Sequence, residues 1–374
     1  MTSSSTGFVI RLRKVLMVGG VNVLGIVLAL GFAEGVARLA GLEARGTIRG
    51  DRGLWRYEAL RGWGLIPGAS GEDYRGGPDR GRVRVNAQGF RGADFARTKG
   101  PGTRRILLLG DSFGFGVGVD EPHTVAARLH DLVNADAELT GGHHVDVLNL
   151  SISGYSTDQE ILTFESDGAP LDPEVVVLLM CDNDFDGNME GFAYGRYYKP
   201  RFLLENGVLR LVDTPAPRAE RRRPARTWLF DHSAFQAALV SWVDRPRLRR
   251  AARFLAPGEA RRSPGSPEEL MVALLEKLNR EVAQVGATLV VFNTGHRGEK
   301  TPLFQSIRPY LDQAGIANLG LEPQLGDARR RRPELEWDFG EDTHWNVPAH
   351  DLAARVMHLH LRKLAREGKV RLAG

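Results

Sequence analysis

RRILLLGDSFG, residues 104–114, is the stretch from which the fold can be inferred. Ile106–Leu109 is an uninterrupted apolar run that ends in Gly110-Asp111-Ser112. A run that is apolar at every position suits a strand buried on both faces, which is the environment of a parallel sheet. We therefore predict a central parallel strand that ends at a tight turn carrying Ser112.

Four further short apolar runs follow this first one along the chain. They predict strands at Val145–Leu150, Glu174–Met180, Ala287–Phe292 and Ile316–Leu319. Between and after them, apolar residues recur at helical spacing, which predicts helices over Pro122 to about Leu139, around Ile161, over Leu270–Val285, and over Pro348 to about Leu364 with Asn346 as N-cap. This alternation predicts an α/β protein with three layers, α/β/α, around a mostly parallel five-stranded sheet.

The composition is that of a globular protein, with 42% hydrophobic and 26% charged residues among 374. The net charge is only +4, but twelve arginines and four acidic residues lie between Arg218 and Arg262. A nucleic-acid binder would carry a wider basic face, so we exclude nucleic acid as a partner. The Arg-rich stretch belongs to a helical insertion at 215–269, which is either a solvated face or a contact for anionic lipid headgroups or polysaccharide.

The N-terminus predicts a single membrane-spanning helix. Arg11, Arg13 and Lys14 precede nineteen uncharged residues, Val15–Ala33. As a helix this run is about 28 Å long, close to the thickness of a bilayer core. The basic flank predicts a cytoplasmic N-terminus and an extracytoplasmic remainder. A cleaved signal peptide is the alternative, although the apolar run is longer than such segments usually are.

We accordingly divide the chain into three parts. We expect residues 1–40 to form a cytoplasmic tail and transmembrane anchor, residues 41–103 a linker and lead-in, and residues 104–366 the α/β domain with its insertion at 215–269. The single cysteine, Cys181, excludes an internal disulfide.

Polar residues gather where the predicted strands end. Ser112 follows the first strand, Ser151-Ile152-Ser153-Gly154 the second, and Cys181-Asp182-Asn183-Asp184 the third, while Glu341-Asp342-Thr343-His344 lies near the C-terminus. In α/β sheets, ligands bind outside the carboxyl ends of the strands. A serine, a histidine with a nearby carboxylate, and neutral hydrogen-bond donors are what ester cleavage through an acyl-enzyme requires.

On these motifs and their order the chain resembles the SGNH hydrolases, also called the GDSL lipase/acylhydrolase family, in their membrane-anchored bacterial form. Gly110-x-Ser112-x-Gly114 also fits the nucleophile elbow of α/β-hydrolases, but here the serine follows the first strand and Asp342 lies two residues from His344. The resemblance covers roughly residues 55–365 and includes the lead-in Asn86-Ala87-Gln88-Gly89-Phe90-Arg91-Gly92. It implies a flavodoxin-like fold.

The resemblance also implies roles for individual residues. Ser112 would be the nucleophile, His344 its base and Asp342 the orienting acid, while the oxyanion hole would comprise the N–H groups of Ser112 and Gly154 and the Asn183 side chain. Two positions depart from the family pattern. Cys181 stands where the third motif usually begins with glycine, and Glu341 has the commoner acid spacing, so Glu341 remains the alternative to Asp342.

We expect a serine ester hydrolase that acts outside the cytoplasm on O-acyl groups of carbohydrate or lipid. The alternatives are an O-acyltransferase that modifies a surface polysaccharide and a non-catalytic, membrane-anchored carbohydrate-binding protein. No cofactor and no metal are expected, because the calcium-loop-like run Asp182-x-Asp184-x-Asp186 has Ala193 where a ligating Glu would stand. The sequence carries no signal of oligomeric state.

Overall fold

The structure is a computed structural model that describes residues 3–39, 53–73, 78–193, 197–218, 265–295, 302–340 and 342–373. The chain divides into two compact units, one of residues 1–48 with 221–259, the other of residues 49–220 with 260–374. Most of the predicted insertion at 215–269 lies outside the described residues, as does Glu341.

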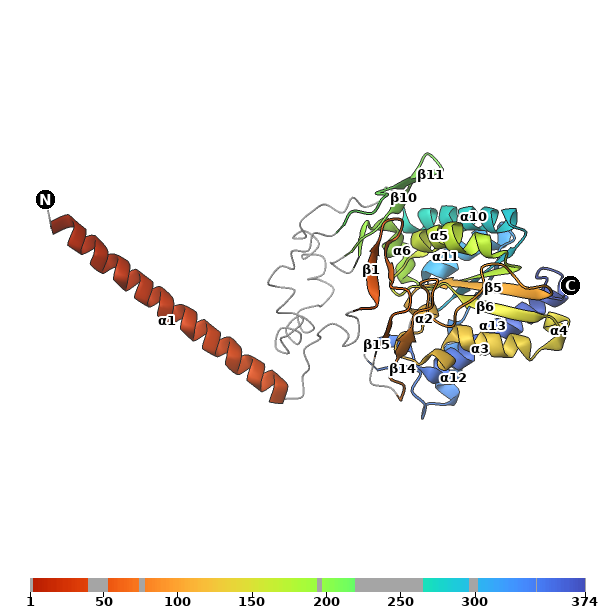
Figure 1. Ribbon diagram of the computed structural model, residues 1–374, viewed down its shortest axis with the longest axis horizontal. Coiled ribbons are helices and arrows are strands. Elements are labelled where there is room, and N and C mark those ends of the chain that lie inside the picture. The colour runs from red at the N-terminus through yellow and green to blue at the C-terminus, as the bar shows by residue number, and fades with distance from the viewer. Residues whose placement is uncertain are drawn as a thin grey trace. The chain divides into compact units, whose positions relative to one another are not determined.

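A five-stranded parallel sheet forms the centre of the larger unit (Figure 1). Its strands are β5 (Thr103–Gly110), β6 (His144–Asn149), β7 (Val175–Met180), β12 (Thr288–Asn293) and β13 (Ala317–Gly320). They lie in the order β13-β12-β7-β5-β6, and every neighbouring pair is parallel. In chain order this is 2-1-3-4-5 read from the β6 edge, the flavodoxin-like order. The predicted α/β class and five-stranded sheet are confirmed.

Helices cover both faces of the sheet, because alternate residues of each strand point to opposite sides. Leu107 and Leu109 of β5 belong to one core cluster, and Ile106 and Leu108 belong to the other. Figure 1 shows α5, α10 and α11 on one side and α3, α12 and α13 on the other. These helices are α3 (Val125–Asn134), α5 (Thr157–Thr163), α10 (Pro267–Gln284), α11 (Pro302–Gln313), α12 (Glu322–Arg331) and α13 (Val347–Arg366).

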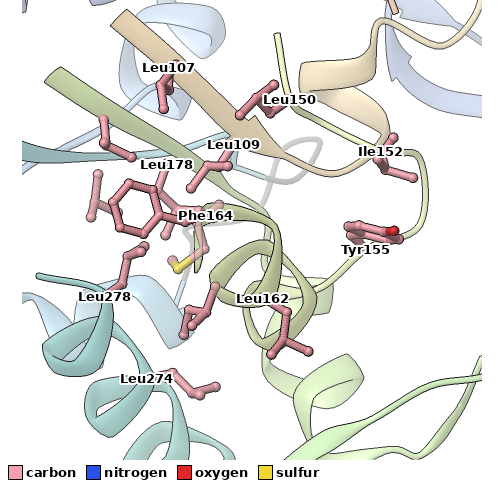
Figure 2. Close-up of a cluster of buried hydrophobic side chains, with 14 of the residues drawn as sticks. Leu107, Leu109, Leu150, Ile152, Tyr155, Leu162, Phe164, Leu178, Leu274 and Leu278 are labelled. Atoms are coloured by element: carbon pink, nitrogen blue, oxygen red, sulfur yellow. The ribbon is translucent and has the colours of Figure 1, made fainter. Parts of the chain in front are cut away.

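The first core cluster is drawn in Figure 2, where side chains of the sheet meet those of α10 and of the segment after α5. Leu109 and Leu178 of the sheet, Phe164, and Leu278 of α10 are all fully buried. Tyr155 and Ile152 extend the same cluster beyond the carboxyl end of β6. Ile152 and Tyr155, on either side of the half-buried Ser153 and Gly154, therefore attach this loop to the core.

The predicted helix over 122–139 is split into three pieces. A short 3-10 turn, η1 (Glu121–His123), precedes α3, which begins at Val125 because Thr124 is its N-cap and accepts the Ala127 N–H. Asp136 then caps a separate helix, α4 (Ala137–Thr140), by accepting the Leu139 N–H. The two capping side chains therefore interrupt one continuous apolar pattern.

The C-terminal helix begins where the sequence predicts. Asn346 is the N-cap of α13, but its side chain makes no cap hydrogen bond. Its amide instead donates to the backbone oxygens of Glu336 and Asp338, at 2.8 and 3.4 Å. This ties the start of α13 to the segment before it.

The lead-in contains two antiparallel strand pairs. They are β1 (Trp55–Glu58) with β2 (Gly62–Leu65), and β3 (Ser70–Glu72) with β4 (Arg82–Arg84). Arg91 is fully buried behind them and donates to the backbone oxygens of Phe115, Gly116, Val119 and Arg82. Burial lowers the pKa of Arg91 to about 10. The four carbonyl acceptors engage the two terminal nitrogens of the guanidinium, whereas its Nε has no hydrogen-bond partner among the described residues.

Small elements complete the larger unit. They are α2 (Ser112–Phe115), α6 (Asn183–Met189), η2 (Phe164–Gly168), η3 (Ala169–Leu171), β8 (Phe192–Ala193), β9 (Tyr197–Tyr198), β10 (Arg201–Glu205), β11 (Val208–Val212), β14 (Asp338–Phe339) and β15 (Asp342–Trp345).

The described part of the smaller unit is one helix, α1 (Ser3–Leu39). Its segment Gly20–Leu39 has a mean hydropathy of 1.8 and is long and apolar enough to cross a bilayer. The length and composition of this segment fit a membrane span, and a signal sequence near an N-terminus has the same properties.

Candidate active site

Four segments that are far apart in sequence meet at the carboxyl ends of the sheet strands. Two of them are short helices that follow β5 and β7, one is the loop after β6, and one is the β14–β15 hairpin. The strand order places Ser112, Gly154 and Asn183 at one edge of the sheet, and the contact between His344 and Ser112 brings the β14–β15 hairpin to the same edge.

Ser112 is the first residue of α2, directly after the turn that ends β5. Asp111 caps this helix, with its side chain accepting the Phe113 N–H at 2.9 Å. The first N–H groups of a helix have no acceptor within it, so the Ser112 N–H is available to a ligand. A Cβ on Gly114 would lie 2.3 Å from the Ser151 hydroxyl oxygen, which explains why the turn needs glycine there.

His344 joins Ser112 to Asp342. Its Nε2 lies 2.7 Å from the Ser112 Oγ, across 232 positions of sequence. Its Nδ1 lies 2.5 Å from Asp342 Oδ1, which also accepts the His344 N–H at 3.1 Å. The Phe113 ring packs against the imidazole at 5.2 Å between ring centres. The three side chains that the sequence predicts therefore form a continuous hydrogen-bonded chain.

The loop that carries Gly154 continues the line of β6 beside β5. The Leu150 and Ile152 N–H groups donate to the oxygens of Leu108 and Gly110, at 2.8 and 3.1 Å. The chain then turns, and Gly154 adopts a φ of +84°. Within the part of the chain that the structure describes, the Gly154 N–H donates to no protein acceptor.

Asn183 is the first residue of α6, at the end of β7. Its carboxamide lies near the Asp111 carboxylate, which also receives a 3.4 Å contact from the Ser112 hydroxyl. Asn183 therefore lies beside the serine. Cys181 is buried, and burial raises the pKa of its thiol well above the ordinary value, which keeps the sulfur protonated and unreactive.

Behind Ser112 lies a set of buried carboxyl groups that sequence reasoning missed. Its members, each no more than 1% exposed, are Asp111, Asp158, Glu160 and Asp184. Asp158 forms a buried ion pair with Lys199, whose Nζ lies 2.6 Å from Oδ1. Asp184 accepts the Cys181 N–H at 2.9 Å.

Burial decides the protonation of this set. It raises the pKa of Glu160 and of Asp184 well above the ordinary range, and the nearby carboxylates raise both further. Both oxygens of Glu160 lack a protein partner among the described residues. The local sequence, Thr157-Asp158-Gln159-Glu160, is typical of an exposed helix start and carries no signal of this burial.

The calcium-loop-like run does not form a loop. Asp182 is the N-cap of α6, and Asp184 and Asp186 lie in its first turn, where Asp184 faces the interior. Across the described ranges, no group of three or more His, Cys, Asp or Glu side chains is arranged to hold a metal ion.

Comparison with known proteins finds similarity to solved structures. No protein-family model and no curated protein matches the chain. A protein from Parabacteroides merdae named as a GDSL-like lipase is 13% identical at a TM-score of 0.41, over 70% of this chain and 96% of that one. An acetylxylan esterase from Geobacillus stearothermophilus is 13% identical at 0.38, over 69% and 94%. A two-domain esterase active on acetylated mannans is 12% identical at 0.40, over 72% and 51%.

Proposed function

We propose that the chain is a serine-dependent ester hydrolase of the SGNH type that works through an acyl-enzyme. The observation that carries this proposal is the 2.7 Å separation of Ser112 Oγ and His344 Nε2, with Asp342 on the far side of the imidazole. A nucleophile, its base and the group that orients the base are the constellation that activates a serine hydroxyl.

In the first half-reaction Ser112 Oγ attacks the ester carbonyl carbon. The hydroxyl proton passes to His344 Nε2, and the carbonyl π electrons move onto oxygen to give a tetrahedral oxyanion. When this intermediate breaks down, the imidazolium returns the proton to the leaving alcohol oxygen. The products of the step are a free alcohol and an acyl ester on Ser112.

Asp342 orients the base and stabilises its charged form. Since Asp342 accepts from Nδ1, the proton of the neutral imidazole is held there and Nε2 is left as the acceptor for the serine. Three neutral donors would hold the oxyanion, namely the N–H groups of Ser112 and Gly154 and the Asn183 carboxamide. Each such donor lowers the barrier by about 3 kcal/mol.

In the second half-reaction water attacks the acyl-serine while His344 takes its proton, and breakdown releases the carboxylic acid and regenerates Ser112. A sugar hydroxyl in place of water would make the same enzyme an O-acyltransferase. Analysis of the products with and without oligosaccharide acceptors separates the two, because only transfer creates a new acylated sugar.

For location, the proposal is that α1 spans the membrane and the larger unit works outside the cytoplasm. The basic residues Arg11, Arg13 and Lys14 before the apolar segment support this orientation. The substrate proposed is an O-acyl group on carbohydrate or lipid, which a membrane-tethered hydrolase would meet at the cell surface.

The test uses the full chain in detergent with p-nitrophenyl acetate as substrate. Ser112→Ala should lower kcat at least about a thousandfold, because it removes the nucleophile. A fluorophosphonate probe should label the wild-type chain, and mass spectrometry should locate the adduct on Ser112. Unchanged turnover in Ser112→Ala would end the proposal. No reaction with the probe, together with retention on a glycan column, would favour the non-catalytic carbohydrate-binding protein.

A further inference from the structure

Trp63 of β2 contacts the loop that carries the proposed oxyanion glycine. Its indole Nε1 donates to the backbone oxygen of Ser153 at 3.2 Å, across 90 positions of sequence. The side chain is 2% exposed, so water does not compete for this hydrogen bond. The lead-in therefore reaches directly into the site.

The accepting oxygen belongs to the same peptide group as the Gly154 N–H. The only cis peptide among the described residues is Thr214–Pro215, so the Ser153–Gly154 peptide is trans. In a trans peptide the C=O and N–H point in opposite directions. A donor that holds the Ser153 oxygen on one side consequently fixes the direction of the Gly154 N–H on the other.

The Ser153–Gly154 peptide is the central peptide of a β-turn, where a peptide group can flip. The Tyr155 N–H donates to the Ile152 oxygen at 3.1 Å, which closes a four-residue turn with Ser153 and Gly154 at its centre. The Gly154 φ of +84° is that of the third residue of a type II turn. Types I and II differ chiefly by a flip of the central peptide, and glycine permits both. The Trp63 hydrogen bond favours the type II orientation.

The indole is itself held in place. The Tyr155 ring packs edge-on against it at 5.4 Å, and the Tyr197 ring lies 5.2 Å away on a tilted plane. The Tyr155 hydroxyl donates to the Trp63 backbone oxygen. These contacts leave the indole N–H no other direction to adopt without unpacking the cluster.

We propose that Trp63 is a positioning residue, whose indole N–H holds the Ser153–Gly154 peptide so that the Gly154 N–H serves as an oxyanion donor. The inference rests on the proposed function, because an oxyanion donor has a role only where an ester carbonyl is attacked. The same hydrogen bond polarises the peptide and strengthens its N–H as a donor.

The experiment compares Trp63→Phe with the wild-type full chain. Trp63→Phe keeps an aromatic ring and removes the N–H, so kcat on p-nitrophenyl acetate should fall about tenfold, less than the 10²–10³-fold loss of an oxyanion donor itself. KM should stay within about twofold. Phenylboronic acid forms an adduct with Ser112 in which a tetrahedral boron bears an oxygen at the oxyanion position, so its affinity should fall by the same factor as kcat.

Trp55→Phe is the matched control, since Trp55 lies in the partner strand β1 and packs against Phe115. It removes an indole of the same hairpin and should leave kcat and boronate affinity unchanged. If Trp63→Phe fails to fold, Tyr155→Phe tests the positioning role of Trp63 instead. It removes only the hydroxyl that holds Trp63 and should lower kcat several-fold with KM unchanged.

Normal kcat and boronate affinity in a folded Trp63→Phe would overturn the inference, even if its melting temperature dropped. The same holds for normal kcat in Tyr155→Phe when Trp63→Phe does not fold. Failure of the proposed function gives a different result. In that case the wild-type chain either has no turnover or has turnover that Ser112→Ala does not reduce.

Discussion

His344 is connected to one residue two positions away and to another more than two hundred positions away. The local connection, to Asp342, follows from β15, where the Asp342 side chain also accepts the His344 N–H. The distant connection, to Ser112, depends on where the whole β14–β15 hairpin lies relative to β5. The catalytic proposal therefore depends on one contact that is local and one that is not.

Substitution of the two candidate acids tests the local connection. Asp342→Ala should lower kcat by about 10³–10⁴, because the imidazole loses the group that fixes its tautomer and stabilises its charge. Glu341→Ala should leave kcat within about twofold. The measurement is kcat on p-nitrophenyl acetate for both variants. A large loss in Glu341→Ala with a small loss in Asp342→Ala would move the orienting role to Glu341.

At the scale of the element, α5 is a helix whose polar residues are buried, although polar residues usually mark an exposed helix face. All seven of its residues are buried, including Asp158, Gln159 and Glu160. Gln159 donates to the Arg61 oxygen at 2.7 Å and Asp158 pairs with Lys199, whereas Glu160 has no protein partner for its oxygens among the described residues. A carboxyl without a compensating cation avoids the cost of a buried charge by staying protonated.

The pH dependence of stability follows from the raised pKa of Glu160. A carboxyl whose folded pKa exceeds its unfolded value contributes stability at low pH, and that stability is lost as pH rises through the folded pKa. Glu160→Gln cannot ionise and should keep its stability at alkaline pH. We expect its melting temperature relative to wild type to rise between pH 5 and pH 9, by about 2–4 °C for each 1 kcal/mol of stability that the wild-type chain loses.

Glu276→Gln on α10 is the matched control, because the Glu276 side chain is 52% exposed. Its melting temperature should follow that of the wild-type chain across the same pH range. A melting-temperature difference between Glu160→Gln and wild type that does not change with pH would contradict a protonated Glu160.

For the whole molecule, we propose that the apolar helix anchors the chain in the membrane and that the larger folded unit carries out catalysis. The sheet, its covering helices and the four site segments all belong to the unit of residues 49–220 and 260–374. The hydrogen-bonded side chains of the site, Ser112, His344 and Asp342, belong to the same unit. Anchoring and chemistry should therefore be separable.

Deletion of residues 1–39 tests this separation. The full chain should sediment with membranes and need detergent for extraction, because the apolar segment Gly20–Leu39 would lie in the bilayer. The deletion variant should be in the supernatant after ultracentrifugation, with kcat on p-nitrophenyl acetate within about twofold of the full chain. If expression of the whole gene instead yields a soluble protein that has lost its N-terminal segment, the helix is a signal peptide.

The sequence by itself determined the class of fold and the positions of the site segments. The reason is that both signals are local: a short apolar run that ends at a turn, such as Ile106–Leu109 before Gly110, favours a buried strand, and strand ends are where α/β proteins place their functional groups. Ser112, Gly154 and Asn183 follow predicted strands, whereas His344 was identified with Asp342 in a separate segment near the C-terminus. The oxyanion roles of Gly154 and Asn183 were implied by the resemblance to the SGNH hydrolases. The strand pairs of the lead-in were not predicted, because their short runs show no clear periodicity.

Tertiary structure alone decided the contacts that join distant segments. No pattern near residue 63 indicates that its indole meets Ser153, and no pattern near residue 160 shows that a polar helix is wholly buried. Such contacts depend on how completed elements pack against one another, and packing reflects the shape of the entire core rather than the residues on either side. The protonation of Glu160 and the orientation of the Gly154 peptide both follow from that packing.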